Sequence, residues 1–86
     1  MIGGSIALPP KIIEDMEPLK MVLHVKTNED MVLVHIQDED LAHFLFNAYR
    51  KGDSIVVNCK VKYSIRTQSN YLLAISISAN SGTRRD

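Results

Sequence analysis

The run Ser54–Arg66 constrains the fold of this chain most strongly, because apolar and polar side chains alternate along it. One set of alternate positions is apolar: Ile55, Val57, Cys59, Val61, Tyr63 and Ile65. The intervening set is mostly polar and includes Lys60 and Lys62. A period of two is typical of an antiparallel strand with one buried face and one solvated face. The run therefore predicts a half-buried antiparallel strand.

Other segments also have strand character. Leu19–Thr27 and Met31–Gln37 flank a short polar segment and predict a hairpin. Tyr71–Ser78 predicts the last strand, with four side chains on its buried face: Tyr71, Leu73, Ile75 and Ile77. A short first strand is indicated at Ser5–Leu8, within an irregular segment rich in glycine and proline.

The register of the first hairpin can be predicted from its apolar face. With a two-residue turn at positions 29–30, Leu23 lies opposite Ile36, and one face of the hairpin becomes strongly apolar. The same register sets His24 opposite His35 on the other face.

The segment Asp38–Lys51 predicts a helix. Asp38 suits the N-cap, and the two acidic residues after it suit the positive end of the helix dipole. Four apolar residues form a stripe at helical spacing: Leu41, Phe44, Leu45 and Ala48. Gly52 is the expected left-handed stop after the helix.

This order of elements predicts one all-β domain with one helix, a five-stranded OB-fold barrel whose helix lies between strands three and four. Closure into a barrel removes the open edges that two separate hairpins would leave. We expect the domain to span residues 1–80 and a flexible C-terminal tail to span 81–86.

Three short pieces resemble bacterial single-stranded DNA-binding proteins: Leu41-Ala42 near the helix start, Arg50-Lys51-Gly52-Asp53 at its end, and the alternating strand that follows. The resemblance covers roughly residues 19–78 and implies an OB fold, binding of single-stranded DNA, and assembly into dimers or tetramers. The chain lacks the tryptophan and the acidic tail usual in that family. A small plasmid-, phage- or primosome-type relative therefore fits best.

Composition narrows the class of protein. The 86 residues are 45% hydrophobic and contain no apolar run near the roughly 18 residues that span a bilayer. The N-terminus does not resemble a signal peptide, and Cys59 is the only cysteine, so we expect a soluble, cytoplasmic domain. The net charge is zero, yet residues 1–49 carry three lysines against eight acids, net −5. The remainder carries seven cations against two acids, net +5, which indicates either mutual neutralisation or a basic face.

Six residues are candidates for contacting single-stranded nucleic acid, which needs cations for phosphates and flat side chains for bases: Lys20, Lys26, Lys60, Lys62, Arg66 and Tyr71. If Ile65 pairs with Tyr71, the neighbours of Lys60 and Lys62 are the small residues Ser76 and Ala74. The alternatives are a solvated outer face for the lysines and a plain hairpin loop around Arg66. The parity of Tyr71 and Tyr63 favours packing at the barrel ends over base stacking.

A second surface is predicted on the outer face of the first hairpin. Val22, Met31 and Leu33 gather there, which favours a subunit interface in a homodimer or higher oligomer over a ligand platform. The sequence has no nucleophile–base pair, metal-ligand spacing or phosphate loop, so we expect no catalysis, no metal and no cofactor.

The leading hypothesis is thus a non-enzymatic, sequence-independent module that binds single-stranded nucleic acid, DNA preferred, in DNA replication or recombination, where a replication or recombination protein would be its partner. The alternative is a protein-interaction or assembly module on the same fold.

Overall fold

The computed structural model describes residues 1–78, and the predicted tail at 81–86 lies outside the described residues. Its elements in chain order are β1 (Ile2–Ile6), β2 (Met21–Lys26), β3 (Met31–Ile36), α1 (Glu39–Ala48), β4 (Ser54–Ser64) and β5 (Ser69–Ser78). No helix within this part of the chain is long and apolar enough to cross a membrane.

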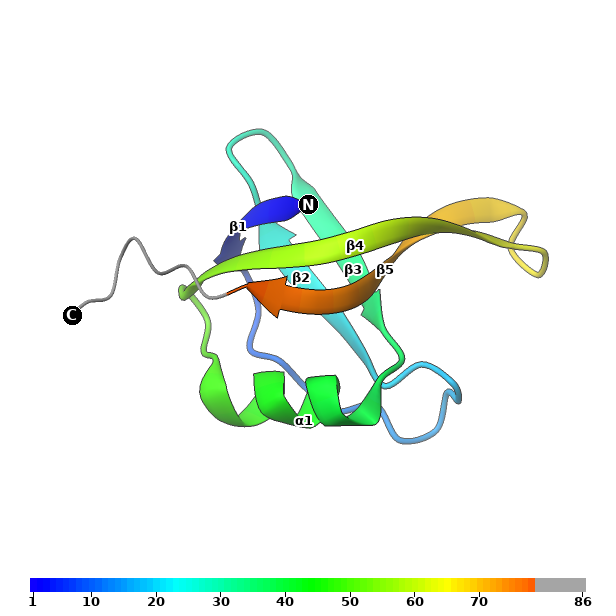
Figure 1. Ribbon diagram of the computed structural model, residues 1–86, viewed down its shortest axis with the longest axis horizontal. Coiled ribbons are helices and arrows are strands. Elements are labelled where there is room, and N and C mark those ends of the chain that lie inside the picture. The colour runs from blue at the N-terminus through cyan, green and yellow to red at the C-terminus, as the bar shows by residue number, and fades with distance from the viewer. Residues whose placement is uncertain (79–86) are drawn as a thin grey trace.

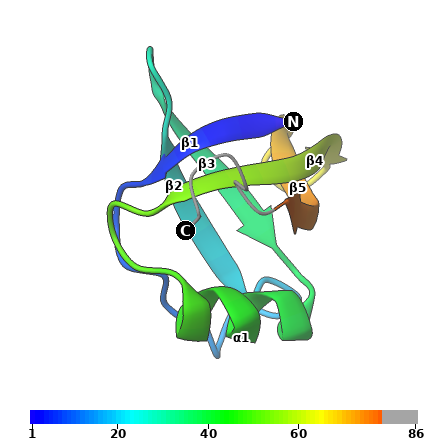
Figure 2. The same cartoon turned by 60° about the vertical axis from the view of Figure 1, so that its left-hand side comes forward.

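The five strands form a closed barrel in the order β1-β2-β3-β5-β4. Neighbouring strands are antiparallel except β3 and β5, which pair in parallel through Val34–Leu72 and His35–Leu73. Helix α1 connects β3 to β4 and lies across one end of the barrel (Figures 1 and 2). The predicted fold class, a five-stranded OB-fold barrel with a helix between strands three and four, is confirmed.

The core is formed by alternate side chains of the strands and by one face of the helix. All its members are apolar, and no polar residue among the described ones is buried. The fully buried side chains include Leu23 and Val25 from β2, Val34 and Ile36 from β3, and Ile55 and Val57 from β4. Burial of these side chains supplies the main driving force for folding.

Helix α1 packs on the barrel through a face that only partly matches the predicted stripe: Leu45 is buried and Leu41 packs against the core, whereas Phe44 and Ala48 are exposed. Asp38 is the N-cap, as predicted, and its carboxylate accepts a hydrogen bond from the Leu41 N–H. Ala42 and Leu45 are fully buried, whereas Phe44, predicted to be core, is 53% exposed. The small side chain of Ala42 faces the core and lets the helix approach the barrel closely. Phe44 instead lies edge-on to Tyr49, with ring centroids 6.0 Å apart.

The helix ends at Ala48, before the predicted end at Lys51. The Asp53 carboxylate accepts a hydrogen bond from the Arg50 N–H, and the Asp53 N–H donates to the Arg50 carbonyl. These bonds close a turn that competes with another turn of helix. Gly52 lies within it at a φ of 95°, the left-handed conformation predicted for this glycine.

The first hairpin keeps its predicted faces but not its register. Leu23 pairs with Val34, and His24 pairs with Leu33 rather than with His35. The turn forms one residue earlier than predicted, because Thr27 donates its N–H to the Asp30 carbonyl and its hydroxyl accepts from the Asp30 N–H. The pairing therefore shifts by two residues, and a shift of two leaves every side chain on its face.

A β-bulge divides β5 into two parts with opposite side-chain parity. Asn58 pairs with Ser76 and Cys59 pairs with Ala74, so Ile75 is the extra, unpaired residue. Ile77 packs against the core as predicted, whereas Ile75 is 56% exposed. On the other side of the bulge Leu72 and Ala74 have the inward parity, so the prediction that Tyr71 and Leu73 face inward is wrong.

The far half of the β4–β5 hairpin extends beyond the barrel (Figure 1). Its tip is a turn at residues 65–68, earlier than the loop predicted at 67–70. Val61, Tyr63 and Ile65 were predicted to continue the buried face of β4, but they are 63%, 61% and 84% exposed. The alternation continues in the sequence, but β1 covers β4 only as far as Val57, which pairs with Ile2 at the start of β1.

Strand β1 begins earlier than predicted, since Ile2–Gly4 pair with β4, and Gly4 also permits a close approach to β2. A Cβ added at Gly4 would overlap the backbone carbonyl of Lys26, whose carbon would lie 2.9 Å away. A Cβ added at Gly3 would meet only a methyl group of Val56, at an ordinary 3.8 Å.

We expect Gly4→Ala to destabilise the domain by about 1 kcal/mol or more, because β1 must move away from β2 to admit the methyl group. Gly3→Ala is the matched control and should change the free energy of unfolding by less than half as much. Urea denaturation of both variants measures the difference. Equal effects would contradict the close β1–β2 approach.

Candidate nucleic-acid interface

The outward side chains of four neighbouring strands form one continuous surface, here called the outer face. Cross-strand pairs place their side chains on the same face of a sheet, so the pairs Val22–His35, Lys60–Leu73 and Lys62–Tyr71 connect the strands. The outer face consists of Val22, His24, Lys26, Met31, Leu33, His35, Lys60, Lys62, Tyr71 and Leu73.

An aromatic pair lies on β3 and β5, the two middle strands of the outer face. The rings of His35 and Tyr71 are stacked, with centroids 4.9 Å apart and planes inclined by 26°. Parallel pairing of β3 with β5 brings these two residues together, and the bulge at Ile75 turns Tyr71 outward. Both residues are half-buried, so each ring is anchored while part of it stays accessible to a ligand.

Two lysines flank this aromatic pair. Lys62 lies directly opposite Tyr71 and Lys60 opposite Leu73, so the predicted neighbours Ser76 and Ala74 are wrong. Their register differs from the prediction because the hairpin turn is earlier; the bulge lies beyond both lysines, between Cys59 and Asn58. Both lysines are exposed. The arrangement sets cations beside a stacking platform, the combination that single-stranded nucleic acid requires.

Arg66 lies at the tip of the β4–β5 hairpin, beside a groove of about 520 Å³. The groove lies between residues 16–19 and the hairpin, and both His35 and Tyr71 line it. Ser64 shapes the tip, since its hydroxyl accepts a hydrogen bond from the Thr67 N–H. Arg66 therefore joins the aromatic pair at one end of the outer face.

Lys26 and Lys20 have different surroundings. Lys26 pairs with Met31 at the far end of the outer face and is exposed. Lys20 forms an ion pair with Glu17 and lines a small hollow beside helix α1, away from the other candidates. The hydrogen bond to Glu17 raises the pKa of Lys20 above its usual value, so this cation is already neutralised by a neighbour.

The strands carry no acidic residue. None of the five described strands contains Asp or Glu, although Lys26, Lys60 and Lys62 all lie in them. The acidic residues among positions 1–78 lie in turns, in the irregular N-terminal segment and around the start of α1. The zero net charge thus conceals a sheet surface that has only positive charge.

The residues predicted to form a subunit interface share the outer face with the nucleic-acid candidates. Met31 and Leu33 are 52% and 48% exposed, and Val22 lies beside His35. A partner subunit bound there would cover part of the candidate nucleic-acid surface.

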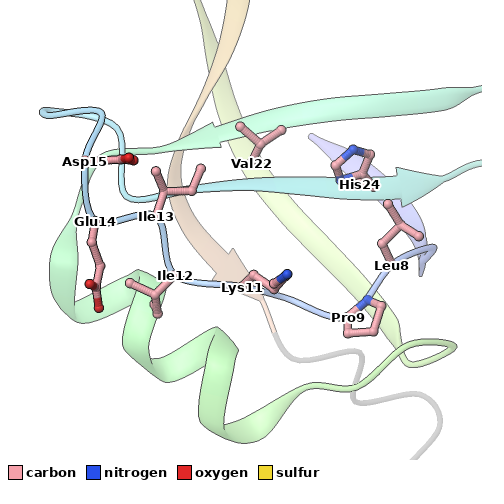
Figure 3. A pocket seen from close by; sticks show the side chains of 9 residues that line it. All are labelled: Leu8, Pro9, Lys11, Ile12, Ile13, Glu14, Asp15, Val22 and His24. Carbon is pink, nitrogen blue, oxygen red and sulfur yellow. The ribbon is translucent and has the colours of Figure 1, made fainter.

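A larger hollow adjoins Val22 and His24, where residues 8–15 arch away from β2 (Figure 3). It has a volume of about 880 Å³ and a mostly apolar lining. Lys11 lies at its rim, but so do Glu14 and Asp15, so its charge does not favour phosphate.

Metal ligation and the reactivity of the cysteine thiol can also be assessed from the structure. No group of three or more His, Cys, Asp and Glu residues within positions 1–78 could hold a metal ion. Burial raises the pKa of the Cys59 thiol, which keeps it protonated at neutral pH and a poor nucleophile.

No direct signal in the sequence marks His35 as a member of the site. The predicted register places it only opposite His24. A hairpin register that starts from the Thr27 turn, together with a parallel β3–β5 pairing, places it beside Tyr71. The chain matches no protein-family model and no curated protein.

Proposed function

We propose that this domain binds single-stranded nucleic acid, DNA in preference to RNA, across its outer face. The observation that carries the proposal is the stacked His35–Tyr71 pair on strands that contain no acidic residue, with Lys60 and Lys62 on the neighbouring strand. Arg66, in the turn at the hairpin tip, lines a groove with the pair, and Glu17 lines it too. In the proposed complex a base stacks on the aromatic pair and the cations contact the phosphates on either side of it.

Such contacts do not read sequence. Stacking and phosphate contacts are available to every nucleotide, so binding is sequence-independent and depends strongly on salt. The proposed preference for DNA and the proposed place in replication or recombination rest on the resemblance to bacterial single-stranded DNA-binding proteins. We also propose that the chain is related to these single-stranded DNA-binding proteins, and the barrel fold supports this.

The second candidate is a protein-interaction module, and the exposed Met31 and Leu33 favour it. In that case the outer face binds another protein or a second copy of this chain in place of nucleic acid. The two candidates differ in salt dependence, because apolar contacts do not weaken as salt is added.

A titration of fluorescein-labelled oligothymidylate, followed by anisotropy at several salt concentrations, tests the proposal. With three to four cations on phosphates, the plot of log K against log salt should have a slope of about −2 to −3. Duplex DNA of equal length should bind more weakly, and oligouridylate measures the preference for DNA. Absence of binding at high micromolar protein and low salt would refute the proposal.

A further inference from the structure

The outer part of β4 has a free edge. Strand β1 pairs with β4 only from Ser54 to Val57, and no described strand pairs with β4 beyond that point on the same side. The other edge of β4 stays paired with β5 as far as Ser64. Residues 60–63 are all exposed. An unpaired strand edge of this kind is a template for the addition of another strand.

The orientation of the backbone along this edge can be worked out. The Ile6 N–H donates to the Asp53 carbonyl at 2.9 Å, so odd-numbered residues of β4 direct their backbone groups toward β1. Backbone groups alternate between the two edges of a strand. The bulge lies in β5 and does not interrupt this alternation in β4. Val61 and Tyr63 therefore present their N–H and C=O groups to the free edge.

The side chains at this edge have two distinct faces. Val61 and Tyr63 are apolar and exposed on one face, and Lys60 and Lys62 are exposed on the other. A strand added here would place alternate side chains beside each set. Its best complement has apolar residues facing Val61 and Tyr63 and acidic residues facing the lysines.

A second copy of this chain is a poor occupant. Antiparallel two-fold pairing of β4 with itself, centred on Lys60, Val61 or Lys62, sets a lysine opposite a lysine of the other copy in every case. Like charges directly opposite each other destabilise a strand pair, and lysines on an edge are a common protection against self-pairing.

We propose that the free edge of β4 at Asn58–Ser64 docks an extended segment of another protein in which acidic and apolar residues alternate. The segment adds to the sheet as a further strand, hydrogen-bonded to Val61 and Tyr63, with its acidic side chains beside Lys60 and Lys62. This inference does not depend on nucleic-acid binding by the outer face.

The test uses a fluorescein-labelled peptide that alternates glutamate with valine, blocked at both ends, and a matched peptide that alternates lysine with valine. Anisotropy should show saturable binding of the acidic peptide and none of the basic one. Val61→Pro removes an edge N–H without removing a β4–β5 bond and should weaken binding by about tenfold or more. Val61→Thr keeps the N–H and should bind as the wild type does.

Amide hydrogen exchange of the wild-type domain gives a measurement that needs no variant. The acidic peptide should slow exchange at Val61 and Tyr63. Binding that Val61→Pro leaves unchanged, or no binding up to about 1 mM protein, would overturn the proposal. Self-association of the wild type that Val61→Pro abolishes would overturn it too, since a second copy would then occupy the edge. Oligonucleotide binding by Val61→Pro should be normal, which separates this result from the proposed function.

Discussion

Leu45→Ala should destabilise the domain by about 2–5 kcal/mol, the range found when a large buried side chain is cut back to alanine. Leu45 is fully buried in the core cluster, where helix α1 closes the end of the barrel. Folded domains have only about 0.05–0.15 kcal/mol of stability per residue, so the loss is a large share of the total in a chain this short. The melting temperature should fall by about 10 °C or more.

Phe44→Ala is the matched control on the same helix. Phe44 is the larger side chain but is 53% exposed, and its ring contact is with Tyr49 on its own connection. Alanine also favours the helix slightly, so the change in unfolding free energy should stay within about 1 kcal/mol. Thermal melts followed by circular dichroism compare the two. If Phe44→Ala were the more damaging variant, Phe44 would lie in the core and its observed exposure would be wrong.

The contrast between Leu45 and Phe44 shows where sequence reasoning about this fold fails. Periodicity predicted that a helix lies between the third and fourth strands, and Asp38 fixed its start. The predicted stripe correctly included Leu45, but Ala42 rather than Phe44 faces the core beside it. Which of these side chains faces the core depends on how closely the helix approaches the barrel. That distance is a property of the packed structure rather than of the helix sequence.

The same limit applies to the candidate site. Alternation in Ser54–Arg66 correctly predicted that Lys60 and Lys62 share an outward face. The prediction that Tyr71 faces inward is wrong because one unpaired residue, Ile75, reverses the side-chain parity of half of β5. No single-sequence signal marks this bulge, since Ile75 suits a regular strand as well as its neighbours do. The stack with His35 depends in turn on a β3–β5 contact between segments far apart in the chain.

The predicted subunit interface overlaps the candidate nucleic-acid surface. The sequence favours self-association for Val22, Met31 and Leu33 and nucleic acid for the lysines, and it predicts only Lys26 on the same hairpin face as these three residues. Both sets lie on the outer face. Self-association through these three residues stays a prediction, and it would compete with nucleic acid there. An acidic segment added at the free edge of β4 would contact Lys60 and Lys62, so it would compete with nucleic acid for these two lysines.

Tyr71→Ala should weaken oligothymidylate binding by about 5- to 150-fold, the effect of losing about 1–3 kcal/mol of base stacking. Tyr71 stacks on His35 on the outer face, and Lys62 lies opposite it across the strand pair. The slope of affinity against salt should stay near the wild-type value, because no cation is removed. A uniform loss at all salt concentrations therefore separates stacking from charge.

Tyr63→Ala is the matched control, since Tyr63 belongs to the same hairpin but to its opposite face. It is 61% exposed and pairs with Asn70, so its removal leaves the outer face intact. Its oligothymidylate affinity should lie within about twofold of the wild type. Anisotropy titrations of the two variants under identical conditions make the comparison, with melting curves to show that both are folded. Equal losses, or a greater loss for Tyr63→Ala, would place the nucleic acid on the wrong face of the hairpin for this proposal, because the bulge at Ile75 is what separates the two tyrosines.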